Sequence, residues 1–565
     1  MGYIMTSWRN TFFSRSPISI GISFDFSEIY PLSVSVPSLY LQLQPYEIGE
    51  QPLPKKFNLL SEETIKIDDN DVEVSFNWSA GAREGLILYR RIGASLEQSP
   101  SDKDCEQFAL LIYSAIKKAI LLPDKENVAL FYTLICQDKL APITYLPYLI
   151  NKIEQDDNLI NNRLYFQLIL WLLYKSPNKN TIKISLGLLS LFRDGISQRL
   201  LFLFALHPEF TLYSLYSIKK RVNYQNISSF FDLLGPRTKD WGRIQFIEYL
   251  PAPLSISTRY WLLTEGYKNN VMIEYVAYNC ATKGKLLEIL NTYPEDPQLL
   301  LGCSDILRAL LNGGPTKDIY DYAQGPQVCL EFINQVNQIS PKELNLLHCV
   351  CEIADFVQNS GEDWLSLGEL GWSDYYQQQI MSLSQHIIQK PQWSALIIKS
   401  LQSHCRTKSY QASLVAKAIH LDIWELLFSL QECNPNADWW HHLMQTDSSY
   451  KIEKVVKLAE QQINISASHN IDTSLINYHS EYKPHHAVEY IMQDLRSFPG
   501  IGWSLIKKQL HSPILRNRNM ALNVLSAWSG IVWPHDLYET LTQVLTIETD
   551  KNTHQRIRKF LANHQ

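Results

Sequence analysis

The sequence predicts a mostly α-helical protein, built as a row of short helix pairs and preceded by a small β-containing N-terminal unit. Three observations lead to this prediction. From residue 105 to the end of the chain, apolar residues recur every three or four positions. Prolines, glycines and asparagines interrupt that pattern at short intervals, so each predicted helix is short. Before residue 100, apolar residues instead alternate one by one, as in a strand with one buried face.

Length and composition suit a folded, extended chain. At 565 residues the chain exceeds the size of a single-core domain, which leaves either several domains or one elongated array. Apolar residues make up 45% of the chain and charged residues 19%, a balance that supports a buried core and excludes disorder. The formal net charge of -6 gives the whole chain no attraction to nucleic acid or to anionic membranes.

Cysteine usage and the lengths of the apolar runs predict a cytoplasmic protein. The 9 cysteines are scattered and odd in number, which fits reduced thiols better than a disulfide framework. No basic region followed by an unbroken apolar run stands at the N-terminus, so no signal peptide is expected. The most apolar stretch, 164–174, is too short to span a bilayer. We therefore expect no membrane partner.

Residues 1–100 are predicted to form the β-containing unit. Apolar side chains there alternate with polar or small ones, which places them on one face of a strand. The polar segment 97–104 breaks this pattern and marks the boundary to the helical part. The alternating residues fall in five stretches, namely 18–26, 32–36, 39–43, 72–78 and 87–89, the last of which contains Ile87 and Tyr89.

Residues 101–464 are predicted to form the helical array. Helices this short are stabilised by packing on their neighbours rather than by intrinsic propensity. Beyond the array, the polar stretch 465–484 is predicted to be a long loop, and residues 485–565 return to helices. The helices at the start of the array are expected near 126–137, 143–155, 159–175, 180–193 and 197–206.

One pair of the array can be followed residue by residue. Pro251 and Pro253 stop a helix, because proline lacks the amide hydrogen and its ring clashes with the preceding turn. Ser255 or Ser257 is placed to cap the next helix by accepting a hydrogen bond from a free amide. Gly266 then ends that helix. Such a pair buries one face and leaves the other to a neighbouring pair, as in stacked helical repeats.

The C-terminal segment resembles a known repeat. Ile514, Arg518 and Ala521 fall where a HEAT repeat places an apolar residue, its arginine and its small residue, and Pro534 begins a partner helix. The resemblance implies a HEAT-like helical-pair solenoid.

A second similarity concerns two other pieces of the chain. The block 241–284 and the heptapeptide RNRNMAL at 516–522 are similar to uncharacterised bacterial proteins that carry the inherited label limonene hydroxylase. That label implies a metal- or cofactor-dependent oxidoreductase. The sequence contains no glycine-rich dinucleotide motif on a strand–helix turn, and no cysteine in a setting that suggests a haem ligand.

Aromatic residues, several of them beside acidic ones, form the first candidate site, for a protein partner. Tryptophan and tyrosine dominate the energetics of interfaces, so exposed clusters of them anchor partners. The alternative is that they fill the core beneath a long connection. The candidates are Trp364, Trp372, Tyr375, Tyr376, Trp439 and Trp440.

The segment FPGIG at 498–502, between two predicted helices, resembles a helix-hairpin-helix turn, in which glycine amides approach a phosphate. From residue 496 onward, nine Lys or Arg against four Asp or Glu leave five net positive charges. The alternative is a tight corner whose glycines let two helices pack closely. The candidate phosphate contacts are Gly500, Gly502, Lys507, Lys508, Arg516 and Arg518.

Histidines and cysteines supply weak metal candidates. His479, His485 and His486 flank the predicted loop 465–484, where they suit either an open metal or pH-sensitive site or plain surface roles. Cys349 and Cys351 are two positions apart, so on a helix they point away from each other and are expected to be buried thiols.

The sequence therefore predicts a non-catalytic protein-binding scaffold or adaptor that has no cofactor. Nucleic-acid binding through 498–502 and the basic helices that follow is the alternative. A metal- or cofactor-dependent oxidoreductase is the second alternative. No catalytic residue is assigned, because the sequence lacks a nucleophile elbow, a P-loop and an H-E-x-x-H motif.

Overall fold

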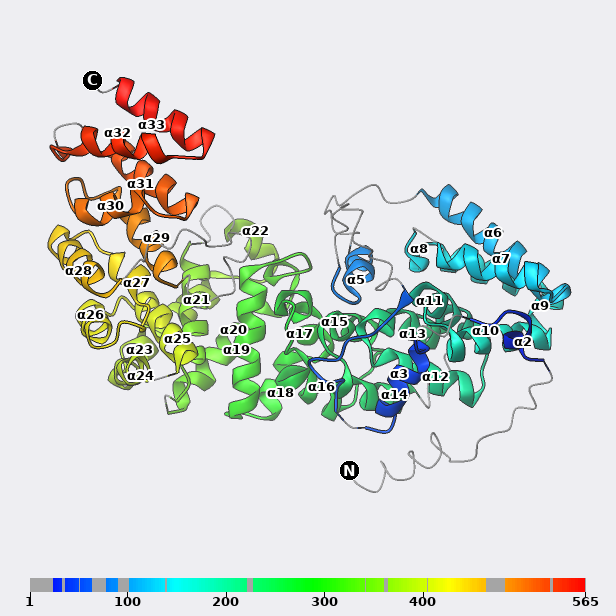
Figure 1. Ribbon diagram of the computed structural model, residues 1–565. Helices are drawn as coiled ribbons and strands as arrows, with labels where there is room; N and C mark the ends of the chain where they lie inside the picture. The colour runs from blue at the N-terminus through cyan, green and yellow to red at the C-terminus, as the bar shows by residue number, and fades with distance from the viewer. Residues whose placement is uncertain are drawn as a thin grey trace. The chain divides into compact units, whose positions relative to one another are not determined.

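The structure, a computed structural model, is helical and contains no strand in the residues that it describes (Figure 1). The chain divides into two compact units, Met1–Gln389 (unit one) and Lys390–Gln565 (unit two). No helix within the described ranges is long and apolar enough to cross a bilayer. The described residues are 24–32, 36–49, 51–62, 78–89, 101–137, 140–220, 227–340, 342–359, 364–403, 405–463, 483–528 and 532–563.

The predicted β-containing unit is wrong where the structure describes it. A cap and a single helical turn decide the conformation here, because the alternating stretches are too short to impose strand pairing. The side chain of Ser38, for example, accepts the amide of Leu41 at 3.4 Å and so begins α3. The predicted stretches at 18–23, 33–35 and 72–77 lie outside the described residues. Six residues expected in strands lie instead on three helices, α2 (Phe26–Ile29), α3 (Leu39–Leu43) and α5 (Ala82–Tyr89). They are Phe26, Leu39, Leu41, Leu43, Ile87 and Tyr89.

The rest of unit one is the helical array. Its first half comprises α6 (Asp102–Leu121), α7 (Lys125–Cys136), α8 (Pro142–Glu154), α9 (Asp157–Ile160), α10 (Arg163–Lys175), α11 (Lys179–Leu188), η3 (Leu189–Leu191), α12 (Gly195–Ala205), α13 (Pro208–Lys220), α14 (Ile227–Leu234) and η5 (Gly235–Arg237). Its second half comprises α15 (Asp240–Tyr249), α16 (Ile256–Trp261), the π-helix η6 (Leu262–Gly266), η7 (Ile273–Tyr275), α17 (Ala277–Lys283), α18 (Leu286–Thr292), α19 (Pro297–Asn312), η8 (Ile319–Asp321), α20 (Gly325–Gln338), α21 (Leu344–Asn359), α22 (Trp364–Glu369) and α23 (Asp374–Ile388).

The predicted array helices are confirmed, with small shifts in their bounds. The helix expected at 126–137 is α7, and the helix expected at 143–155 is α8. The helix expected at 159–175 is divided into α9 and α10, because the side chain of Asn162 accepts the amide of Leu164 at 2.9 Å and begins a new helix there. Ser255 caps α16 by accepting the amide of Thr258 at 3.1 Å, as predicted.

Each helix of the array packs mainly on helices one or two places away in the chain. α6 packs on α7 and α8, α13 on α11, α12 and α15, and α19 on α17, α20 and α21. Figure 1 shows α18, α19 and α20 side by side. A row whose contacts are made between near neighbours is the arrangement of an α-helical repeat solenoid.

α19 shows how the sequence produces this packing. Its apolar residues recur at helical spacing and are buried, and Asp296 caps its first turn by accepting the amides of Gln298 and Leu299. Gly302 faces η6, where a Cβ atom would lie 1.8 Å from the carbonyl oxygen of Leu263. Only glycine allows this approach between α19 and η6.

Residues 36–49 and 51–62, here called the strap, lie along the array and contain α3 and η1 (Gln44–Tyr46). α3 packs on α10 and α12, and the amide of Leu39 donates to the carbonyl of Ser176 at 3.1 Å. Glu47 is 3% exposed and forms a bidentate ion pair with Arg199. The strap is therefore part of the core of unit one.

Helix α5 is fastened to the array by a buried ion cluster. The ammonium of Lys183 lies 2.6 Å from Glu84 of α5 and 2.5 Å from Glu209 of α13. All three side chains are largely buried, so each charge relies on the others for compensation. Gly85 sits against Trp241 of α15, whose ring would be 2.3 Å from an added Cβ atom.

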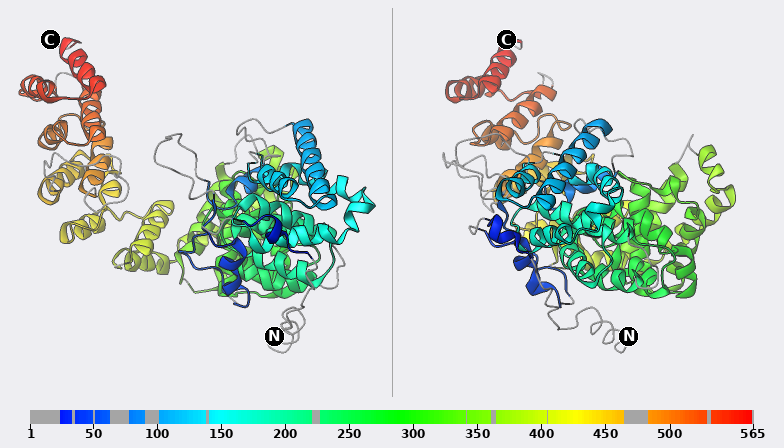
Figure 2. Two further views of the ribbon diagram at one scale, coloured as in Figure 1. Left: turned by 45° about the vertical axis from the view of Figure 1, so that its right-hand side comes forward. Right: turned by 90° about the vertical axis from the view of Figure 1, so that its right-hand side faces the viewer.

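Unit two continues the pattern of short helices. α29 packs on α27 and α31, and α31 on α30 and α33, so that these helices succeed one another as layers (Figures 1 and 2). The turn at 498–502 lies between two helices, α29 and α30, as predicted. Most of the predicted loop at 465–484 lies outside the described residues. The helices are α24 (Pro391–Leu401), α25 (Arg406–Ala418), α26 (Trp424–Cys433), α27 (Trp440–Met444), α28 (Ser449–Gln462), α29 (Lys483–Leu495), α30 (Trp503–Leu510), α31 (Leu515–Ala527), α32 (Leu537–Ile547) and α33 (Lys551–Asn563).

Candidate functional site

Unit two contains a pocket of about 470 Å³ between two helix corners, here called the corner pocket. One corner joins α24 to α25 and the other joins α26 to α27. Half of the lining residues are exposed, so the pocket is open to solvent. The lining residues are Leu401, Gln402, Ser403, Arg406, Ser409, Tyr410, Leu430, Cys433, Asn434, Asn436, Ala437, Asp438, Trp439 and His442.

The first wall of the pocket, residues 401–403 and 405–410, is fixed by the buried hydroxyl of Ser409. This hydroxyl lies within hydrogen-bonding distance of the carbonyls of Ser400 and Ser403, each at 3.1 Å, and of Cys405 at 3.2 Å. Its single hydrogen can be donated to any one of these carbonyls of the same tight corner, which helps to hold the corner backbone in place. The first wall is therefore preorganised.

The second wall, residues 430–439, is fixed in the same way by Gln431, which is 0% exposed. Its side-chain oxygen accepts the amide of Trp439 at 2.8 Å, and its side-chain nitrogen donates to the carbonyl of Pro435 at 3.3 Å. The same nitrogen donates to Gln462 of α28 at 3.0 Å. One buried amide side chain thus ties the corner to two helices.

His442 and Trp439 line the pocket below its mouth. Nε2 of His442 lies 2.8 Å from the hydroxyl of Ser413, and its ring meets the ring of Trp439 edge-on at 5.4 Å. Burial lowers the pKa of His442 to about 4, and neighbouring His441 and Lys417 act in the same direction. At neutral pH the imidazole is therefore uncharged.

An ion pair joins the two walls at the mouth. Nη2 of Arg406, at the start of α25, lies 2.9 Å from Oδ2 of Asp438 in the second corner. The two side chains are 81% and 39% exposed, so both can reach a ligand. Asp438 has a φ of +64°, an uncommon backbone conformation for a residue other than glycine. Tyr410, which is 56% exposed, lines the same pocket, and its ring lies 6.4 Å from that of His442.

The chemistry of this lining suits recognition. It offers hydrogen-bond donors and acceptors, aromatic edges and one ion pair, which together can orient a ligand. Among the described residues no group of three His, Cys, Asp or Glu side chains is placed to hold a metal ion.

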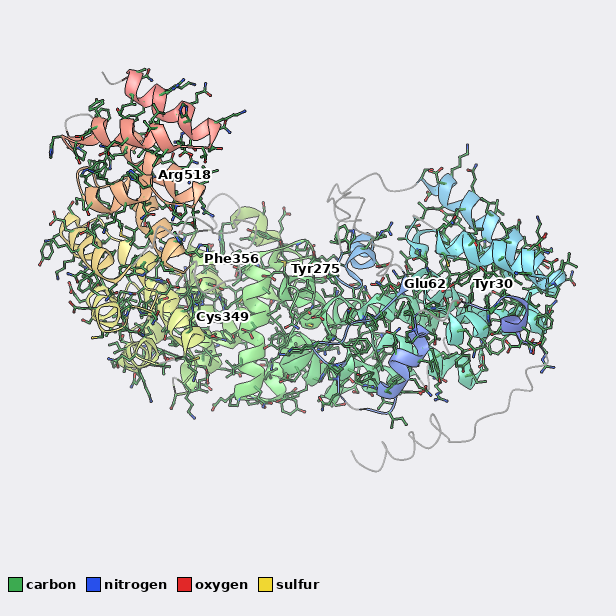
Figure 3. All side chains as sticks on the ribbon, in the orientation of Figure 1. Tyr30, Glu62, Tyr275, Cys349, Phe356 and Arg518 are labelled. Carbon is green, nitrogen blue, oxygen red and sulfur yellow. The ribbon has the colours of Figure 1, made fainter. Side chains whose placement is uncertain are left out.

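The predicted partner-binding aromatics lie in three different settings. Trp372 and Trp440 are 1% and 2% exposed, so they fill the core. Phe356, labelled in Figure 3, packs edge-on against Trp372 at 5.1 Å. Trp439 is buried but lines the corner pocket. A buried ring has no free area for a partner, so Trp372 and Trp440 correspond to the alternative of core filling.

The remaining aromatic candidates belong to α22 and α23 of unit one. Tyr375 is 61% exposed and its ring lies 5.4 Å from that of Tyr376. The indole nitrogen of Trp364 donates to Asp374 at 3.3 Å. These side chains and those of the corner pocket belong to different units, so they do not make one described site.

The glycines of the predicted hairpin turn serve a tight corner. Gly500 and Gly502 both have a φ of +86°, which side chains with a Cβ atom rarely adopt. A Cβ atom on Gly502 would lie 3.2 Å from Leu495 and 3.4 Å from Val456. The turn itself therefore packs closely against α29 and α28, directly before α30 begins.

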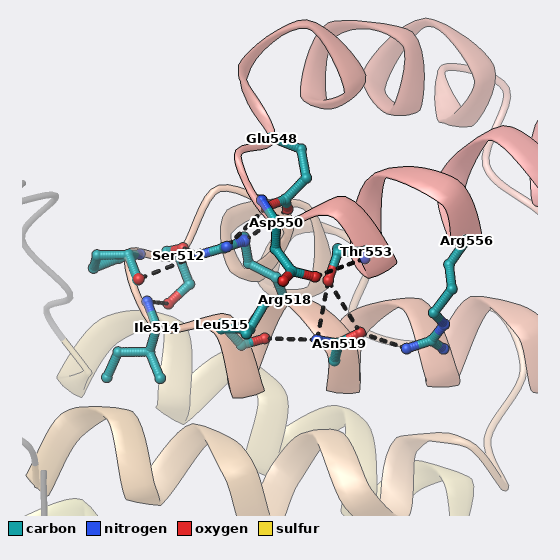
Figure 4. A network of polar contacts seen from close by, with 10 residues as sticks. Ser512, Ile514, Leu515, Arg518, Asn519, Glu548, Asp550, Thr553 and Arg556 are labelled. Atoms are coloured by element: carbon teal, nitrogen blue, oxygen red, sulfur yellow. Dashed lines mark hydrogen bonds and ion pairs between the residues drawn. The ribbon is translucent and has the colours of Figure 1, made fainter. Parts of the chain in front are cut away.

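Three of the four predicted phosphate-binding cations are occupied by carboxylates. Lys507 lies 2.7 Å from Asp536, and Arg516 lies 3.5 Å from Glu489. Arg518 makes two bonds to Glu548, at 2.8 and 2.9 Å (Figure 4). Lys508 is exposed and makes no ion pair with a described residue. A phosphate would have to compete with these carboxylates.

The two described histidine candidates are engaged separately. His485 is 4% exposed and lies 3.5 Å from the side-chain nitrogen of Asn517. Burial lowers the pKa of His485, so its ring is neutral at physiological pH. Nδ1 of His486 lies 3.6 Å from Glu489. His479 lies outside the described residues.

Sequence reasoning missed most of the corner pocket. It singled out Trp439 but not Arg406, Ser409, Gln431 or Asp438; the ion pair of Arg406 and Asp438, for example, joins two corners that are 32 positions apart. One signal was available in the run Asn-Pro-Asn-Ala-Asp at 434–438, which is rich in turn-forming residues and directly precedes two tryptophans.

The comparisons leave the description at the level of the fold. No protein-family model matches the chain, and none of the curated proteins compared with it is significantly similar. The fold and the site define an α-helical repeat protein with an open, preorganised pocket in its second unit.

Proposed function

We propose that the protein is a non-catalytic scaffold that binds partner proteins, and that the corner pocket is where one partner is held. The observation that carries this proposal is the pocket itself. It is open and has two rigid walls, its lining mixes aromatic, amide and charged groups, and it lies in a row of helices. Rigid walls lower the entropy lost on binding, because the residues that meet the partner are already ordered.

The strap supports the proposal by showing what such helices can hold. In unit one, Arg237 donates to the carbonyls of Tyr46 and Glu47, and Lys239 donates to those of Leu53 and Pro54 at 3.2 and 3.1 Å. These bonds go to main-chain carbonyls, which every peptide offers. A helical row of this kind is therefore able to hold an extended segment of polypeptide.

The same proposal places the protein in the cytoplasm. All nine cysteines are free thiols, and Cys405 and Cys433 are exposed. Exposed thiols persist in a reducing compartment, which supports the location expected from the sequence.

Affinity capture with matched variants tests the scaffold function. The full chain, tagged at its C-terminus, would be compared with the pocket variants Tyr410→Ala and Arg406→Gln. The controls are Tyr450→Ala, which removes a tyrosine of α28 that is 66% exposed, and Arg516→Gln, which removes an arginine that is 72% exposed and has a carboxylate partner. We expect the captured amount of at least one protein to fall about tenfold or more with both pocket variants and to stay unchanged with both controls.

The opposite pattern would reject the proposal. If quantitative mass spectrometry finds the same captured proteins at the same levels with the pocket variants and the controls, no partner uses the corner pocket.

A further inference from the structure

We propose that the corner pocket recognises the main chain of an uncharged, extended peptide segment. Arg406 and Asp438 would both hydrogen-bond to one peptide unit of the segment. One apolar side chain of the segment would enter the pocket and contact Tyr410 and Trp439. This inference rests on the proposed scaffold function and names the chemistry of the partner segment.

The charge of the lining selects a neutral ligand. Among the described lining residues, one side chain is cationic and one anionic, Arg406 and Asp438, and they already neutralise each other. The imidazole of His442 adds no charge at neutral pH, because burial disfavours its protonated form. A ligand with a net charge would pair with one of the two and leave the other without its partner.

A peptide unit matches both members of the pair. The guanidinium of Arg406 can donate to a carbonyl oxygen, and the carboxylate of Asp438 can accept an amide hydrogen. Separating the pair costs little, since exposed ion pairs contribute only about 0–1 kcal/mol. Hydrogen bonds to charged groups are stronger than those between neutral groups, so the exchange favours the peptide.

The shape of the pocket favours a passing chain over an enclosed metabolite. Sites for small molecules bury about 70–90% of the ligand surface. Here seven of the fourteen lining residues are exposed, among them Gln402 on the first wall and Asn436 on the second. Such a pocket can hold one side chain and its flanking peptide units while the chain continues beyond both ends.

The apolar part of the lining gives the entering side chain a place. Leu401 and Leu430 belong to the two walls, and Trp439 and His442 supply ring edges between them. Aromatic edges and aliphatic groups together favour an aromatic or branched aliphatic side chain.

Ligand-observed NMR on the full chain tests this chemistry with three matched small compounds. N-acetyl-phenylalaninamide is neutral and carries an amide group on each side of its α-carbon. N-acetyl-phenylalanine replaces one unit with a carboxylate, and phenylalaninamide replaces the other with an ammonium group. We expect the neutral compound to receive the largest saturation transfer. We expect its dissociation constant to rise about tenfold with Arg406→Gln or Asp438→Asn, and to stay unchanged with the control Arg516→Gln.

Other outcomes would overturn the inference. Stronger binding of the carboxylate compound that persists in Asp438→Asn would make this an anion site, and stronger binding of the ammonium compound would make it a cation site. No transfer to any of the three compounds would remove a peptide-binding role from the pocket. The substituted side chains are exposed, so circular dichroism of the variants should match that of the unaltered chain.

The two proposals fail in different ways. If capture of a partner depends on Tyr410 while a charged compound binds best, the scaffold function stands and the neutral-peptide inference is wrong. If the neutral compound binds through Arg406 and Asp438 while no captured protein depends on the pocket, the pocket chemistry stands and the scaffold function is wrong.

Discussion

At the scale of single residues, the buried ionisable side chains of unit one depend on their surroundings for their protonation states. His207 is 7% exposed, and its Nδ1 accepts the amide of Glu209 at 3.3 Å. Its ring packs against Phe57 and Phe210 at 5.8 Å each. Burial lowers the pKa of His207 to about 4, although the Glu209 carboxylate favours the protonated ring. The folded state therefore holds a neutral imidazole where an unfolded chain, with a pKa near 6.5, holds a charged one.

This difference predicts a pH dependence of stability. Above pH 6.5 both states hold a neutral imidazole, and the stability is fully present. As the pH falls from about 6.5 to about 4, the unfolded state binds a proton that the folded state rejects, so the free energy of unfolding decreases. The pKa difference of about 2.5 corresponds to roughly 3 kcal/mol. We expect the free energy of unfolding, measured with urea, to fall less between pH 7 and pH 4 in His207→Gln than in the unaltered chain, and the difference should be about this amount.

An exposed histidine provides the control. His386 of α23 lies on the surface of the same unit, so His386→Gln should follow the curve of the unaltered chain. Equal losses of stability for His207→Gln and the unaltered chain would contradict the assigned role of His207. The pKa of the Glu209 carboxyl is lowered to about 2, so its contribution to stability is lost from about pH 4.5, the unfolded value, downward, and only the start of this loss falls within the tested range.

At the scale of elements, the strap is held by a few cations of the array. Arg237 is 4% exposed and stacks over the ring of Phe202 at 5.4 Å while it donates to two strap carbonyls. Burial lowers the pKa of this guanidinium to about 10, which still leaves it charged at neutral pH. Its bonds to the strap are therefore charge-assisted and stronger than those between neutral groups.

Replacing this arginine should loosen the strap. Arg237→Met keeps an unbranched side chain but removes its donors, which leaves the carbonyls of Tyr46 and Glu47 without this partner. We expect a loss of about 2–3 kcal/mol and a corresponding rise of roughly 30-fold or more in hydrogen exchange of the strap amides. Arg193→Met, at an exposed position of the same array, should leave the exchange unchanged. Unchanged protection of the strap in Arg237→Met would show that apolar contacts alone hold it.

Most helices could be predicted from the sequence, because each is encoded by residues within a few turns of one another. Capping by Ser255 and the position of Arg518 are local signals of that kind. The strap could not be predicted in the same way, since the pattern 39–43 is too short to distinguish one helical turn from a strand. What fixes the strap is a partner, Arg199 or Arg237, that lies more than a hundred positions away.

The candidate site was harder to predict than the fold for the same physical reason. Arg406 and Asp438 are 32 positions apart, and Ser413 and His442 are 29 apart. Neither pair leaves a pattern in a single helix, because each pair forms only when two corners are stacked. Trp439 was singled out because an aromatic residue is a candidate by its type alone.

At the scale of the whole molecule, the two units should be energetically separate. In a row of repeats each helix is stabilised by its neighbours, so a local change is felt mainly within its own stack. Arg518 of unit two is a suitable point for such a change. It pairs with Glu548, which is 1% exposed, and it also donates to the carbonyl of Ser512 at 2.9 Å. Figure 4 shows Arg518 of α31 bonded to Glu548, which directly follows α32, and beside it the contacts of Asn519 with Thr553 and Arg556 of α33.

Arg518→Leu should therefore destabilise unit two and leave unit one unchanged. Removing the guanidinium leaves a buried carboxylate without its cationic partner and with only the amide of Asp550, at 2.9 Å, as a donor, which costs about 3–5 kcal/mol. Arg516→Leu, whose arginine is 72% exposed, should cost at most about 1 kcal/mol. In urea, hydrogen exchange read by mass spectrometry should show residues 390–565 opening at lower denaturant in Arg518→Leu, while residues 101–389 keep the midpoint of the unaltered chain. If both segments shift together, the chain unfolds as one cooperative body, and the division at Gln389 and Lys390 is one of geometry alone.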